Sequence, residues 1–132
     1  MTLKLRILKD LTWCVGPYSI KRKFLNQQVE LRAFLESKKN IYEFTTNIEI
    51  EVREAMIIGK TGDLQFLDNR VSRQHCKIRK HFLGHWVLED LKSTNGTFIR
   101  RGKMLIRLME GEWKLQKEDI IILANYHELQ VL

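Results

Sequence analysis

Short runs of alternating apolar and polar residues fill the chain from about residue 47 to its end. The run 47–52 alternates strictly and places Ile48, Ile50 and Val52 on one face. Similar or fully apolar runs lie at 55–59, 64–67, 75–79, 85–91, 97–99, 104–109, 120–124 and 127–132. A period of two is that of a β-strand, and strands about 8–12 residues apart are typical of sandwiches and barrels. The pattern predicts an all-β fold, a twisted antiparallel β-sandwich of about ten or eleven strands.

The first 40 residues follow this pattern less closely. In the segment 26–40, Leu31, Phe34 and Leu35 recur at the i, i+3 and i+4 spacing of a helix. This spacing predicts one short helix in an N-terminal extension. Two further runs could be strands or a strand pair: 3–8 and 11–15.

Length and composition fit one globular domain, because the chain has 132 residues and 44% of them are hydrophobic. We expect a single domain over 1–132, with 1–40 as an extension or irregular first strands and 41–132 as the β-sandwich core. No apolar run approaches the roughly 18 residues of a membrane helix, and the N-terminus lacks the apolar core of a signal peptide. We therefore expect an intracellular protein, nuclear or cytoplasmic, without a membrane partner. The two cysteines, Cys14 and Cys76, are expected to be reduced.

Two polar clusters, 72–75 and 93–96, and the pair Gly59-Lys60 lie at the ends of expected strands. Hydroxyl, amide and charged donors gather in or near them without a paired carboxylate: Lys60, Arg70, Ser72, Arg73, Ser93, Thr94 and Asn95. Such donors suit an anion with several acceptor oxygens, such as a phosphate ester, and the net charge of +7 favours acidic partners. Taken singly, the same residues are also those of hairpin turns.

The order of these clusters resembles the forkhead-associated (FHA) family, a β-sandwich that binds phosphothreonine peptides. The resemblance covers residues from about 55 to the end, slightly more than half of the chain. Its motifs are Gly59-Lys60, Ser72-Arg73-Gln74-His75, Glu89-Asp90-Leu91, Ser93-Thr94-Asn95-Gly96-Thr97-Phe98 and the closing segment Leu115 to Ala124. Several separated motifs in the family's order are far more specific than any one of them.

The resemblance implies roles for each residue of the clusters. Ser72 and Thr94 would contact the phosphate, Asn95 would fix the peptide backbone, and Arg73 would lie beside one or the other. Lys60 would stand where the family has its phosphate-binding arginine. The site would be supported by Gly59, His75, Ser93 and Gly96, with His75 bonding between the loops rather than reacting. The implied function is recruitment of a phosphothreonine-containing protein, without catalysis or cofactor.

The sequence departs from the family at Lys60, which offers a point charge in place of a planar fork. Glu118 and Ala124 replace glycines of the last hairpin, which concerns the fold more than the site. A further hypothesis is that Arg70, in the loop before Ser72, favours an acidic residue three positions after the phosphothreonine. An ordinary solvated loop charge is the alternative at this position.

Other classes of function have weaker support in the sequence. No nucleophile elbow or phosphate loop is present, so we expect no enzyme. His81 and His85 flank Gly84 in a turn and have no ligand companions, so we expect no metal site. Basic residues with Phe82, Trp86 and Trp113 could instead form a nucleic-acid-binding surface, and the sequence does not favour this alternative. A phosphate-independent interaction module of the same fold stays open.

Overall fold

In a computed structural model, the backbone is described for residues 2–13, 18–24, 27–33, 41–44, 49–66, 68, 70–124 and 127–132. Side chains are described for 2–8 and for those residues from 49 onwards. The first strands are β1 (Leu3–Trp13), β2 (Tyr18–Phe24), β3 (Gln27–Ala33), β4 (Ile41–Phe44), β5 (Glu49–Val52), β6 (Ala55–Gly59) and β7 (Leu64–Gln65). The others are β8 (Cys76–Lys80), β9 (Trp86–Asp90), β10 (Thr97–Arg101), β11 (Met104–Leu108), β12 (Glu112–Lys114), β13 (Ile120–Leu123) and β14 (His127–Val131).

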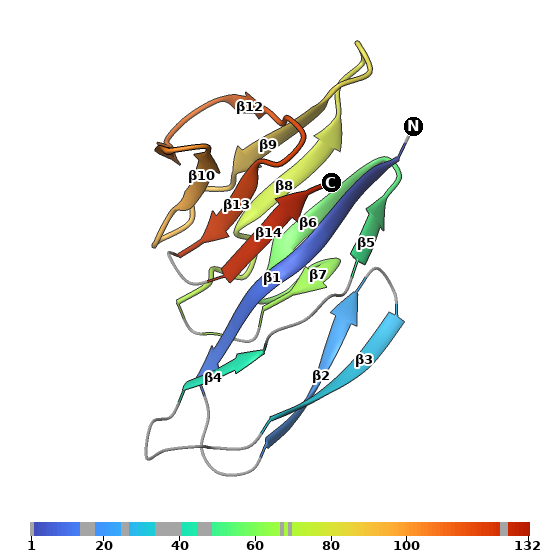
Figure 1. The fold of residues 1–132 in the computed structure, drawn as a ribbon, viewed down its shortest axis with the longest axis vertical. Coiled ribbons are helices and arrows are strands. Elements are labelled where there is room, and N and C mark those ends of the chain that lie inside the picture. Colours follow the sequence, from blue (N-terminus) through green and yellow to red (C-terminus); the bar gives the residue numbers. More distant parts are fainter. Residues whose placement is uncertain are drawn as a thin grey trace.

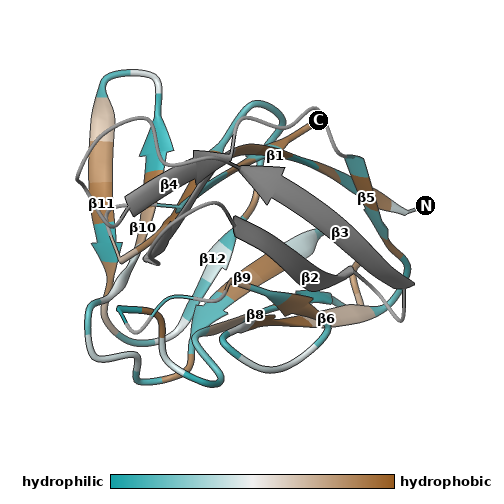
Figure 2. Cartoon of the chain, turned by 90° about the horizontal axis from the view of Figure 1, so that it is seen from below, coloured by the Kyte–Doolittle hydropathy of each residue, from teal (hydrophilic) through white to brown (hydrophobic). Residues whose placement is uncertain are grey.

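The strands form two sheets that face each other, as the sequence predicts. One sheet has the order β11-β10-β13-β14-β1-β4, with β5 also paired to β1, and the other has the order β12-β9-β8-β6-β7-β2-β3. Among the strands of the described residues, every pair is antiparallel except β6 with β7, which is parallel. Figure 1 shows β13, β14 and β1 side by side, and Figure 2 shows β1, β10 and β11 in one layer and β6, β8 and β9 in the other. The predicted all-β sandwich is therefore confirmed.

Alternating side chains of both sheets fill the space between the layers. In β8, Cys76 and Ile78 point into the core, while Lys77 and Arg79 lie on the other face. The fully buried side chains come from both layers and include Leu5, Met56, Phe66, Leu88, Ile99 and Leu129. Each buried side chain of this size contributes roughly 1.5–3 kcal/mol. The rigid core fixes the strand ends, and the loops at those ends carry the candidate site.

The predicted helix is wrong. Residues 27–33 form β3, which pairs along its whole length with β2. Val29, Leu31 and Ala33 alternate with polar residues, so a period of two was present and local strand pairing decided the outcome. Phe34 and Leu35, which completed the helical spacing, lie outside the described residues.

The described residues form fourteen strands, where the sequence predicts about ten or eleven. The two expected runs 3–8 and 11–15 belong largely to one long strand, β1, and four strands were missed: β2, β3, β4 and β12. The described residues contain no helix able to span a membrane. Cys76 is a free, buried thiol whose pKa is raised by its burial, whereas Cys14 lies outside the described part of the chain.

Candidate functional site

The candidate residues lie in three loops at one end of the sandwich. In the register of the second sheet, Ile58 of β6 pairs with Cys76 of β8, and Cys76 pairs with Asp90 of β9. The end of β6, the start of β8 and the end of β9 are therefore neighbours. This antiparallel register brings the Gly59-Lys60 pair, the 70–75 loop and the 91–96 loop to the same edge, although they are far apart in the sequence.

A buried histidine joins two of these loops. The backbone N–H of Ser72 donates to Nδ1 of His75 (3.1 Å), so the ring proton lies on Nε2. That Nε2 lies 2.7 Å from the carbonyl oxygen of Gly96 and donates to it. Burial lowers the pKa of His75 below its ordinary value, which favours the neutral ring that this pair of bonds requires. His75 therefore holds the 72 and 96 loops together without carrying charge.

Ser72 is the point at which the three loops meet. Its side-chain oxygen accepts a hydrogen bond from the backbone N–H of Thr94 (3.1 Å), and its carbonyl oxygen accepts one from the backbone N–H of Lys60 (2.9 Å). A Cβ at Gly59 would lie 2.2 Å from the carbonyl oxygen of Arg73. Glycine is thus required here by the close approach of the two loops, not by a positive φ.

Asn95 ties the 91–96 loop to the start of the neighbouring loop. Its side-chain amide donates to the carbonyl oxygen of Arg70 (2.7 Å). The guanidinium of Arg70 binds the carboxylate of Asp68, with Nη2 to Oδ2 at 2.6 Å and Nε to the two carboxylate oxygens at 2.9 and 2.8 Å. Asp68 also accepts from Nε2 of His127 (2.8 Å). The buried Asp68 carboxylate therefore supports the loop from inside the fold, and the Arg70 guanidinium points toward it.

A second carboxylate organises the polar loop itself. Asp90 Oδ1 accepts hydrogen bonds from the hydroxyls of Ser93 (2.5 Å) and Thr97 (2.7 Å). The Ser93 hydroxyl oxygen accepts in turn from the backbone N–H of Gly96 (3.1 Å), whose φ is +89°. The turn chemistry read from the sequence and the candidate site are therefore compatible, because the same residues close the turn and hold Thr94 and Asn95 outward.

The structure brings together donors from all three loops. Lys60, Arg73, Thr94 and Asn95 are exposed, and Ser72 is half-buried. Ser72 uses its oxygen as an acceptor for Thr94, and a serine hydroxyl has one further proton to donate. The surface that results combines hydroxyl, amide and cationic donors, which is the chemistry that a phosphate ester requires.

Two functional neighbours were missed from the sequence, Asp68 and His127. They lie 59 positions apart, and both are almost fully buried. In the sequence, Asp68 lies in an Asp-Asn pair typical of turns, and His127 is at the start of an alternating run. The pattern around Asp68 gave no local signal for a buried charge, so only the fold reveals the contact.

The features that favoured other functions are separated from this site. Phe82 is 88% exposed in the β8–β9 turn, at the other end of β8, whereas Trp86 is buried. Trp113 is half-buried, and the Cζ of Arg101 lies over its ring, 4.8 Å from the ring centroid. These three aromatics form no continuous stacking surface next to the loops. Within the described part of the chain, no group of three or more His, Cys, Asp or Glu side chains could hold a metal ion.

A family model described as "FHA domain" matches residues 53–124, which is more than half of the chain and includes all three loops. No curated protein matches the sequence.

Solved structures share the fold. An FHA domain of a hypothetical protein from Arabidopsis thaliana has a TM-score of 0.63 at 18% identity, over 98% of this chain and 83% of that one. An FHA domain from Chlamydia trachomatis has a TM-score of 0.54 at 21% identity, over 100% and 97%. A structure from work on phosphothreonine-dependent FHA domain interactions has a TM-score of 0.53 at 22% identity, over 99% and 95%. At these identities the likeness concerns the fold.

Proposed function

Because the chain belongs to the forkhead-associated family, whose members are recognition modules rather than enzymes, we propose that it binds phosphothreonine-containing peptides. The bound protein would be recruited through its phosphothreonine, without chemical change. The ligand would lie across the edge formed by Lys60, Ser72 and Thr94, with Asn95 and Arg73 beside it.

The observation that carries this proposal is the bond from the Thr94 backbone N–H to the Ser72 side-chain oxygen. It joins two loops 22 positions apart and brings their hydroxyl-bearing residues together before any ligand arrives. The buried His75 ring supports the same arrangement through its hydrogen bonds with Ser72 and Gly96. A site whose donors are already positioned loses less conformational entropy on binding.

Each residue has a physical role in this proposal. A phosphothreonine carries a charge of about −1.5 to −2 and three acceptor oxygens. The Lys60 ammonium would neutralise part of that charge, and the hydroxyls of Ser72 and Thr94 would donate to the oxygens. Asn95 would bond the peptide backbone next to the phosphothreonine. Arg73 would contribute a second positive charge at the exposed rim.

Titration of the full chain with a degenerate phosphothreonine peptide library, beside the unphosphorylated library, tests the proposal. Ser72→Ala and Thr94→Val should each weaken binding by at least about tenfold, because a charge-assisted hydrogen bond contributes roughly 1.5–3 kcal/mol. Gln74→Ala is the matched control, since this exposed residue is in the same loop and should leave binding unchanged. Circular dichroism checks that the variants keep the fold.

Equal binding of phosphorylated and unphosphorylated peptides would contradict the proposal and favour the phosphate-independent interaction module. Binding to single-stranded DNA or RNA with a steep salt dependence, undiminished by Ser72→Ala, would favour the nucleic-acid surface.

A further inference from the structure

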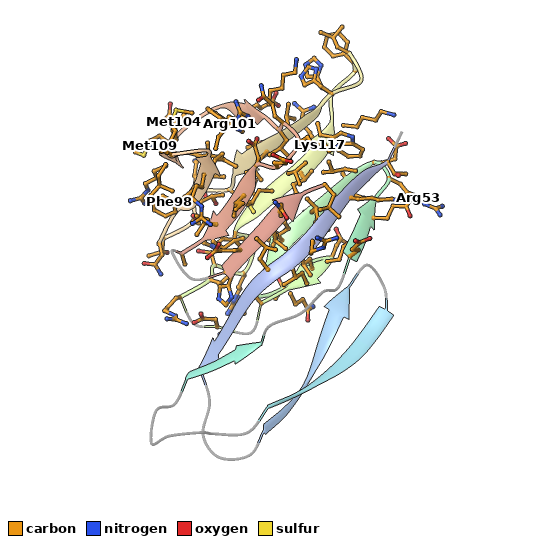
Figure 3. All side chains as sticks on the ribbon, in the orientation of Figure 1. Arg53, Phe98, Arg101, Met104, Met109 and Lys117 are labelled. Atoms are coloured by element: carbon orange, nitrogen blue, oxygen red, sulfur yellow. The ribbon has the colours of Figure 1, made fainter. Side chains whose placement is uncertain are left out.

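The β10–β11 hairpin carries a basic side chain beside the polar loop. In its register, Phe98 of β10 pairs directly with Arg107 of β11, and Ile99 pairs with Ile106. Ile99 is fully buried in the core, so Phe98 and Arg107 lie on the opposite, outer face of the sheet. Phe98 and the exposed Met109, which follows β11, are on the same flank of the sandwich (Figure 3).

The guanidinium of Arg107 reaches back to the polar loop. Its Cζ lies 5.8 Å from the centroid of the Phe98 ring. A Cβ at Gly96 would be 2.8 Å from the Arg107 Nε and 3.1 Å from its Cζ. The guanidinium therefore occupies the space beside Gly96 that a side chain would otherwise fill. A stack on Phe98 within about 6 Å is a favourable cation–π arrangement that holds the group there.

Unlike its neighbours, this arginine has no acidic partner in the described part of the chain. In the same hairpin, Arg100 pairs with Glu128 (2.8 Å) and Arg101 pairs with Asp119 (2.7 Å). Arg107 is exposed and has five N–H donors in a planar fork, which matches the geometry of a carboxylate or phosphate. Leu105, two residues earlier in β11, is exposed on the same face of the sheet.

We infer that Arg107 forms a second anion subsite, which takes an oxyanion from a residue flanking the phosphothreonine of the same peptide. The inference rests on the proposed function, because it extends the same binding edge past Gly96. The oxyanion is a side-chain carboxylate or a second phosphate. Arg107 is thus a specificity-determining residue separate from Arg70, whose guanidinium binds Asp68.

The test compares phosphothreonine peptides in which each flanking position in turn carries Asp, phosphoserine or Ala. At one position the wild-type chain should prefer the acidic peptide over the Ala peptide by about three- to tenfold, as expected for an exposed bidentate pair. The Asp and phosphoserine arms show which oxyanion is preferred. Arg107→Ala should reduce that ratio to near one, and Arg107→Lys should leave an intermediate ratio. Lys103→Ala is the matched control, because it removes an exposed positive charge from the turn of the same hairpin.

The ratio of the two affinities is the readout, since a role of Arg107 in merely holding the 93–96 loop would change both affinities equally. A ratio unchanged in Arg107→Ala, or equally lowered by Lys103→Ala, would overturn the inference while leaving the proposed function intact. If the wild-type chain binds no phosphothreonine peptide at all, the proposed function fails and the inference with it.

Discussion

Lys60 decides how firmly a phosphate could be held at the centre of the proposed site. Its backbone N–H is fixed by the Ser72 carbonyl oxygen, so the base of the side chain is positioned at the edge of the loops. The ammonium at its end is exposed. Lysine offers a strongly hydrated point charge on a flexible stem, whereas arginine grips two oxygens in one plane. A site with this lysine should bind phosphate with less geometric discrimination than one with arginine.

Lys60→Arg should therefore raise the affinity for a phosphothreonine peptide, by about three- to tenfold, because one charge-assisted bond is added. Lys60→Gln should lower it by about tenfold or more. Lys103→Arg, on the exposed turn of the β10–β11 hairpin, controls for a general effect of arginine. Isothermal titration calorimetry measures all three variants. Unchanged affinity in both Lys60 variants would show that this residue does not contact the phosphate.

Asp68 is the buried charge on which the 70–75 loop depends. Its carboxylate is 1% exposed and binds both Arg70 and His127. Asp68→Asn should lower the free energy of unfolding by about 3 kcal/mol, because the Arg70 guanidinium loses its anion and His127 loses its carboxylate acceptor. Glu49→Gln, which removes an exposed ion pair with Arg6, is the control and should cost less than about 1 kcal/mol. Urea denaturation distinguishes the two, and equal losses would contradict a structural role for Asp68.

The same carboxylate gives the unfolding free energy a defined acid dependence. Burial raises the pKa of Asp68, but hydrogen bonds from His127 and Arg70 outweigh burial and hold the pKa well below its usual range. A lowered folded-state pKa stabilises the protein above the unfolded value of about 3.9, and this contribution is lost as the pH falls below it. The wild-type chain should therefore lose stability more steeply than Asp68→Asn below about pH 4 in denaturation curves. Parallel curves for the two chains would contradict this.

The candidate site residues that the sequence revealed are those in loops at strand ends. Such loops lie close together when their strands are neighbours in a sheet. The roles that escaped prediction depend on contacts across the fold. For Arg70 the sequence suggested a preference for an acidic peptide residue or a solvated loop charge, and it gave no sign that the guanidinium binds Asp68. Arg107 is in a largely apolar run without a motif, and its approach to Gly96 depends on the pairing of β11 with β10 and on the placement of its side chain.

At the scale of elements, the closing hairpin explains two departures from the family pattern. Glu118 has φ +74° and Ala124 has φ +53°, both in the left-handed region where the family has glycine. Hydrogen bonds hold each backbone there: the Glu118 N–H donates to Val131 (2.7 Å) and the Ala124 N–H donates to Gly96 (3.0 Å). A side chain at positive φ costs roughly 1 kcal/mol or more. The closing hairpin therefore keeps its backbone conformation at a free-energy cost at these two residues.

Glu118→Gly and Ala124→Gly should each stabilise the protein, by about 0.5–1 kcal/mol after the larger chain entropy of glycine is subtracted. Lys117→Gly is the matched control, because this neighbouring turn residue has no positive φ. This substitution should lower the free energy of unfolding by a similar amount. Thermal unfolding followed by circular dichroism gives the sign for each variant. Destabilisation by all three substitutions would show that the left-handed conformation costs little here.

Element type was predictable where alternation was strict and strands were bounded by turn residues, as in β5 and β8. It failed between residues 18 and 44, where β2, β3 and β4 were missed and one segment satisfied two periods. Residues 27–33 alternate as a strand, but Leu31 also begins a helical spacing toward residues further on. Pairing with β2 over seven residues resolves the ambiguity, and such pairing cannot be read from one segment. Strand order was equally hidden, since β1 pairs with β14 at the other end of the chain.

At the scale of the whole molecule, β1 connects the part of the chain matched by the family model to the rest of its sheet. That match ends at residue 124, before β14, and begins after β5. β1 lies between β14 on one side and β5 and β4 on the other, and it contributes Leu3, Leu5 and Ile7 to the core. The residues that carry the site thus depend on a strand that the motifs do not include. We expect residues 1–132 to fold as one domain for this reason.

A chain restricted to residues 49–132 should accordingly fail to unfold cooperatively in urea, because β14 and β5 lose their shared neighbour and three buried side chains leave the core. In the full chain, Leu5→Ala is the milder test and should cost about 3 kcal/mol, the range for a large apolar side chain removed from a core. Lys4→Ala, at an exposed position of the same strand, is its control. A synthetic peptide of residues 2–13 should restore a cooperative transition to the shortened chain, since the missing strand can pair again from outside. A shortened chain that unfolds at the same urea concentration as the full chain would show that β1 is dispensable and that residues 49–132 are a domain in themselves.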